Sequence, residues 1–111
     1  MKTYSAQSGY VYQYFYEGCR DAEGRAGGQE YVFSISPDRK NWHDASVFLA
    51  EDAVRGWETA QQRTLTSTER YAVAKLALFQ AFDERPTPAG LKEAVHVRAE
   101  DVEAFIESLG L

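Results

Sequence analysis

The stretch TSTERYAVAKLALFQAFDER, residues 66–85, decides the fold of this chain. Its apolar residues recur three and four positions apart, and this spacing predicts an α-helix from about 67 to 85. Thr66 and Glu69 have the spacing of a capping box at the start of the helix, and Pro86 stops it at the other end.

This helix is apolar on nearly all of its sides, because only Lys75 and Gln80 interrupt the middle of the run. A helix of this kind must be covered nearly all round. It is therefore either the central helix of a compact monomer, or its surplus apolar face meets a second copy of the chain.

The segment SGYVYQYFYEG, residues 8–18, predicts a β-strand over 9–16. A strand sends alternate side chains to opposite faces. Gln13 lies in the middle of the opposite face, and a buried glutamine needs partners, which favours tyrosines that point inward. Several phenols in one core would also need partners, so the sequence leaves both orientations open. The residues that would stand in one row are Tyr10, Tyr12, Tyr14 and Tyr16.

Further strands are predicted where residues 31–36 and 45–49 alternate and where 93–97 are rich in valine. Residues 17–30 are rich in glycine and predict a long flexible loop. We expect 18–29 to be the most mobile part of the chain. The expected fold is α+β: an antiparallel sheet of three to four strands, with three helices packed on one face and the helix near 67–85 central. The expected core is Tyr31, Phe33, Ile35, Val47, Leu49, Leu76, Phe79, Val102, Phe105, Ile106 and Leu109.

Composition narrows the class of protein. The chain has 111 residues, which is the size of one domain, and a net charge of -5 from 12 basic and 17 acidic residues. Its basic residues are scattered, so we expect no nucleic-acid binding. No apolar run is long enough to span a bilayer, so we also expect no membrane association. Cys19 is the single cysteine, which suits a cytoplasmic location.

The residues best able to carry chemistry are Trp42, His43 and His96, which we consider as a possible pocket. Histidine serves as a general base or a metal ligand. However, no HxxxH, CxxC or HExxH spacing is present. We therefore expect no catalytic residue, no metal and no cofactor.

These observations favour a small, non-enzymatic protein of bacterial type that acts through protein–protein contacts. We expect a homodimer or another protein partner, with the tyrosine row as the contact surface, because tyrosine gives a large contact area and tolerates wet and dry surroundings. The alternative is a small-molecule-binding protein or enzyme with a tyrosine-lined pocket between sheet and helix.

Overall fold

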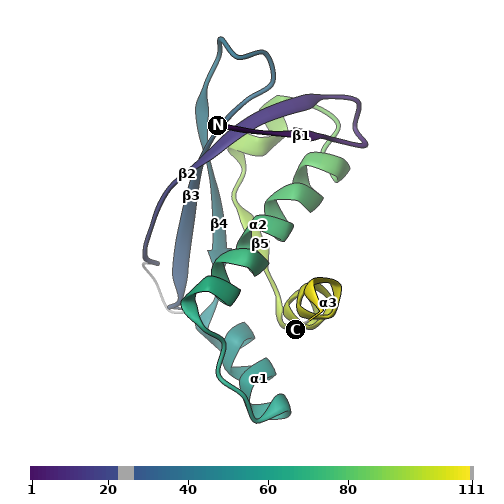
Figure 1. Ribbon diagram of the computed structural model, residues 1–111. Helices are drawn as coiled ribbons and strands as arrows, with labels where there is room; N and C mark the ends of the chain where they lie inside the picture. The colour runs from purple at the N-terminus through teal and green to yellow at the C-terminus, as the bar shows by residue number, and fades with distance from the viewer. Residues whose placement is uncertain (23–26, 111) are drawn as a thin grey trace.

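The computed structural model describes residues 1–22 and 27–110, and Figure 1 shows an α+β fold. Its strands form one five-stranded sheet in the order β1-β2-β3-β4-β5. The strands are β1 (Lys2–Ser5), β2 (Val11–Asp21), β3 (Gln29–Ser36), β4 (His43–Leu49) and β5 (Val95–Val97). The helices are α1 (Glu51–Gln61), α2 (Ser67–Glu84), the short 3-10 helix η1 (Pro88–Lys92) and α3 (Ala99–Leu109).

The sheet is mixed and larger than predicted. β1 to β4 pair antiparallel, whereas β5 pairs parallel to β4. The parallel pairing arises because the chain leaves the end of β4, makes α1 and α2, and returns to run beside β4 in the same direction. β1 was not predicted, because its sequence KTYS is short and has no apolar alternation.

β2 continues to Asp21, so the prediction of a loop over residues 17–30 is wrong at both ends. A bulge between Tyr16 and Gly18 shifts the register, and β2 then continues to pair with β3, with Cys19 opposite Tyr31. The bulge breaks the apolar alternation that reveals a strand in the sequence. Residues 23–26 of the segment that we expected to be mobile lie outside the described residues.

α2 crosses one face of the sheet, here called the inner face (Figure 1). Its predicted capping box is present, since Glu69 N donates to Thr66 Oγ1 (3.1 Å) and Thr66 N donates to Glu69 Oε1 (2.9 Å). The helix buries Val73, Ala74, Ala77, Leu78, Ala81 and Phe82. Its surplus apolar surface is covered within the subunit in part by α3 and β5.

Most of the predicted core is confirmed: Tyr31, Phe33, Ile35, Val47, Leu49, Val102 and Ile106 are buried. Leu76, Phe79, Phe105 and Leu109 are only half-buried. On α2, the ridge that contains Leu78 and Phe82 faces the core, and Leu76 lies to one side of it. The predicted helical period is therefore confirmed, but the ridge that faces the core contains Leu78 and Phe82 and not Leu76 and Phe79.

Gly28 fixes the corner where β3 begins beside the end of β4. A Cβ atom at this position would lie 2.2 Å from the carbonyl oxygen of Leu49, and the backbone has φ +90°. Only glycine fits such an approach without displacing the backbone of its neighbour. This contact packs the start of β3 against the connection from β4 to α1.

Candidate functional site

The tyrosine row lies on the inner face of the sheet. Tyr12 is 0% exposed and Tyr14 is buried, while Tyr10 and Tyr16 at the ends of the row are exposed. The ring of Tyr12 stacks on Phe82 of α2, with centroids 4.2 Å apart. The centre of the row is therefore packed into the core of the subunit, and the row does not form a continuous exposed surface.

Only some of the tyrosine hydroxyls on the inner face form hydrogen bonds. The hydroxyl of Tyr4, on β1, donates to Asp83 Oδ2 at 2.7 Å, and burial together with Asp83 raises the pKa of Tyr4 to about 12. The Tyr12 hydroxyl has no hydrogen-bond partner among the described residues, and burial raises its pKa. Packing against aromatic rings of α2 thus outweighs the cost of one unsatisfied hydroxyl.

The opposite face of the sheet, here called the outer face, is the side away from α2. Three large apolar side chains are exposed on it: Val11, Phe15 and Trp42. Phe15 is 42% exposed and Trp42 37% exposed, and their ring centroids lie 5.6 Å apart. We call these three residues the outer apolar cluster.

Small polar residues share this face with the cluster. Gln13, Ser34 and Ser36 alternate with inner-face residues along β2 and β3, and all three are buried. The Gln13 Oε1 atom has no hydrogen-bond partner among the described residues. A buried acceptor without a donor is costly. The sequence placed Gln13 opposite the tyrosines but did not show that it would be buried there.

The structure does not bring Trp42, His43 and His96 together as one pocket. Trp42 immediately precedes β4, and His43 is its half-buried first residue. His96 lies on β5 opposite Phe48, near the other end of β4, and their rings stack with centroids 5.4 Å apart. Within the described ranges, no group of three or more His, Cys, Asp or Glu side chains is placed to hold a metal ion.

His96 and Phe48 instead line a cavity of about 520 Å³ near the starts of α1 and α3. These starts lie side by side because α1 follows β4, α3 follows β5, and Leu49 pairs with Val97. Each helix carries two acidic residues in its first turn, which suits the positive end of a helix dipole. Of these acids only Asp52 lines the cavity, and Arg98 lines it as well, so the lining carries charges of both signs.

A second hollow opens on the inner face, between β2, β3 and the first turn of α2. It has a volume of about 460 Å³. We call it the tyrosine hollow; its lining is Tyr16, Cys19, Gln29, Tyr31, Ser67, Thr68 and Tyr71. Only Tyr16 of this set was a predicted site residue, because the other members come from segments far apart in the chain.

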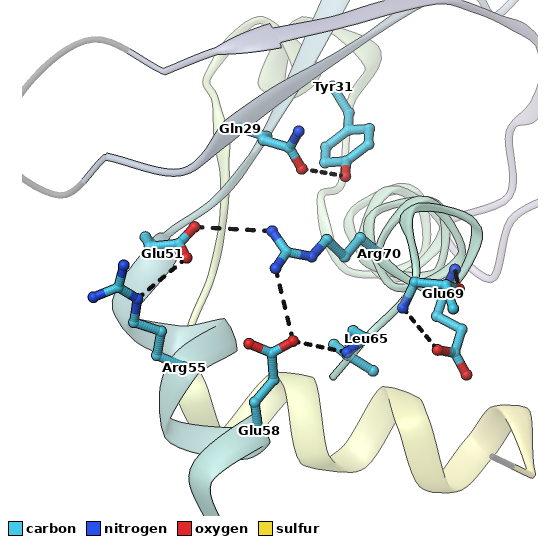
Figure 2. Close-up of polar contacts among 9 residues, drawn as sticks. Gln29, Tyr31, Glu51, Arg55, Glu58, Leu65, Glu69 and Arg70 are labelled. Atoms are coloured by element: carbon cyan, nitrogen blue, oxygen red, sulfur yellow. Dashed lines mark hydrogen bonds and ion pairs between the residues drawn. The ribbon is translucent and has the colours of Figure 1, made fainter. Parts of the chain in front are cut away.

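Figure 2 shows what fixes the wall of the hollow beside α2. The Tyr31 hydroxyl donates to Gln29 Oε1 at 2.9 Å. The Arg70 guanidinium on α2 lies between Glu51 and Glu58 of α1, with N–O separations of 3.8 Å and 3.7 Å. Glu58 also accepts a hydrogen bond from Leu65 N at 2.7 Å. These contacts tie α1, the connecting segment and α2 together.

The groups in the hollow are held in their protonated forms. Burial raises the pKa of the Cys19 thiol and of the Tyr16 and Tyr31 hydroxyls. A thiol attacks as the thiolate, so a raised pKa makes Cys19 a poor nucleophile near neutral pH. These side chains are therefore able to donate hydrogen bonds near neutral pH.

Comparison with known proteins gives no relative: no protein-family model, no curated protein and no solved structure matches this chain. Among the described residues, no helix combines the length and the apolar character that crossing a membrane requires.

Proposed function

We propose that this protein acts through protein–protein contacts made by the outer face of its sheet, and that its partner is a second copy of the chain. The observation that carries the proposal is the contact between the exposed rings of Phe15 and Trp42 on the outer face, where Val11 is exposed as well. Large apolar side chains gathered on one surface mark interaction sites more often than scattered ones do.

The composition of the face fits a contact surface. Aromatic residues are enriched in protein interfaces. Phe15 and Trp42 supply two such rings on the outer face, in contact with each other.

The face is a better contact surface than the edge of the sheet. β1 pairs only with Val11–Tyr14, so the rest of β2 has no neighbouring strand among the described residues on that side. A strand with a free edge can pair with another chain, but the bulge between Tyr16 and Gly18 interrupts its regular hydrogen-bonding pattern. We therefore place the contact on the face and not along β2.

The exposed Cys19 thiol, the single cysteine of the chain, is in keeping with a reducing compartment. We accordingly propose a cytoplasmic location. Each copy has a net charge of -5, so the two copies repel one another at long range. Added salt screens this repulsion, and the proposed dimer should therefore become stronger as ionic strength rises.

Sedimentation equilibrium of a Phe15→Ser/Trp42→Ser variant tests the proposal. The parent chain is expected to dimerise at micromolar concentrations, and the variant to dissociate at least about 30-fold more readily, because central aromatic contacts are often worth about 2 kcal/mol or more. Tyr10→Ser is the control, since Tyr10 is 37% exposed but lies in the tyrosine row. A parent chain that remains monomeric at several hundred micromolar would contradict the proposal.

A further inference from the structure

The tyrosine hollow lies on the inner side of the sheet, away from the outer apolar cluster. An inference about it is therefore independent of the proposed function. The hollow has a volume of about 460 Å³, which is in the range of small-molecule sites. Its walls come from β2, β3 and α2, which are regular elements and hold side chains more rigidly than loops do.

The lining carries hydrogen-bonding groups without formal charge. Ser67 and Thr68 contribute hydroxyls, Gln29 an amide and Cys19 a thiol, and three tyrosines add phenol groups. Hydroxyls both donate and accept hydrogen bonds. The nearby guanidinium of Arg70 is already engaged by two carboxylates of α1. The hollow therefore offers hydrogen bonds in both directions and lacks a free counter-ion for a charged ligand.

The tyrosine rings are tilted toward one another. The Tyr16 and Tyr71 centroids lie 4.7 Å apart with an interplanar angle of 56°, and the Tyr31 and Tyr71 centroids lie 6.5 Å apart at 53°. This arrangement has no pair of parallel rings between which a flat aromatic ligand would be sandwiched. A ligand instead lies against a single ring face, and Tyr16 is exposed enough to present one.

We infer that the tyrosine hollow binds an uncharged, hydroxylated ring of the class of monosaccharides and cyclitols. The C–H face of such a ring packs against one tyrosine, and its hydroxyls exchange hydrogen bonds with Ser67, Thr68 and Gln29. The bond from Tyr31 already orders Gln29, and the capping box of Thr66 and Glu69 fixes the backbone of the first turn of α2, which carries Ser67 and Thr68. Less entropy is therefore lost when the ligand binds.

Two-dimensional NMR titration of the full chain tests this inference. The probes are D-glucose, D-galactose and myo-inositol, with D-glucose 6-phosphate and cytosine as charged and flat aromatic comparisons. At least one of the three hydroxylated rings is expected to cause saturable shifts at the amides of Cys19, Gln29 and Thr68, with a Kd of about 1 mM. No saturable shift from any of the three, or stronger binding of either comparison compound, would overturn the inference.

A matched pair of variants tests the location of the site. Thr68→Arg places a long side chain in the lining of the hollow, whereas Thr59→Arg makes the same change at an exposed position on α1. Binding of the responding probe is expected to weaken at least about tenfold in Thr68→Arg and to stay unchanged in Thr59→Arg. Equal binding by the two variants would overturn the assignment. Circular dichroism of both variants confirms that they are folded.

Discussion

Both faces of the sheet carry aromatic side chains but use them differently. On the inner face, Tyr12 and Phe33 are fully buried beneath the helix layer. On the outer face, Phe15 and Trp42 contact each other and remain exposed. The difference shows that an aromatic side chain on a strand is not core by itself; the position of the apolar helix α2 decides whether it is buried.

The largest expected effect is the loss of stability caused by a substitution in the core of the inner face, compared with a substitution at the margin of that core. Phe33→Ala should lower the free energy of unfolding by about 3–5 kcal/mol, because it leaves a cavity beneath α2. Leu76→Ala should cost less than about 2 kcal/mol, because Leu76 is only half-buried. Urea denaturation measures both values. Equal losses in the two variants would mean that α2 presents a different ridge to the sheet.

The second prediction concerns the loss of stability at alkaline pH that arises from Tyr4, a residue of the inner face. The pKa of Tyr4 is raised to about 12 by burial and by its hydrogen bond to Asp83. A tyrosine with a raised folded-state pKa contributes stability that is complete below its unfolded pKa, about 10, and is lost as pH rises toward 12. We expect a loss on the order of 1–2 kcal/mol from this residue over that interval.

Urea midpoints measured between pH 9 and pH 11.5 test this expectation. The Tyr4→Phe variant cannot ionise at that position, so its midpoint should fall less steeply with pH than that of the parent chain. Parallel pH profiles for the two proteins would show that Tyr4 is not responsible for the alkaline loss.

The third and smallest effect concerns the unpartnered Tyr12 hydroxyl. Tyr12→Phe removes a buried polar atom that makes no hydrogen bond among the described residues and keeps the ring against Phe82. The variant should be as stable as the parent chain or more stable by up to about 1 kcal/mol. A loss of more than 1 kcal/mol would indicate that the hydroxyl has a partner after all.

Local patterns in the sequence predicted the parts of the fold that depend on neighbouring residues. The capping box of Thr66 and Glu69 and the stop before Pro86 placed the ends of α2 to within about a residue. Alternation identified β3 and β4. The orientation of the tyrosine row stayed open, because it depends on which face α2 covers.

Features that depend on distant residues were not predicted. β1 exists because its backbone pairs with β2, and its polar side chains carry no signal. The bulge before Gly18 hid the second half of β2. The tyrosine hollow combines residues of β2, β3 and α2, and Arg70 reaches back to two carboxylates of α1. No short sequence motif predicts such contacts between distant residues.

Hydroxyl-radical footprinting at two protein concentrations tests the contrast between the faces most directly. If the outer face is the contact surface, oxidation of Phe15 and Trp42 should fall as the concentration rises from about 1 to several hundred micromolar. Tyr10, which is equally exposed but lies in the inner row, should be oxidised at the same rate throughout. Unchanged oxidation of Phe15 and Trp42, or protection of Tyr10 in their place, would contradict the account.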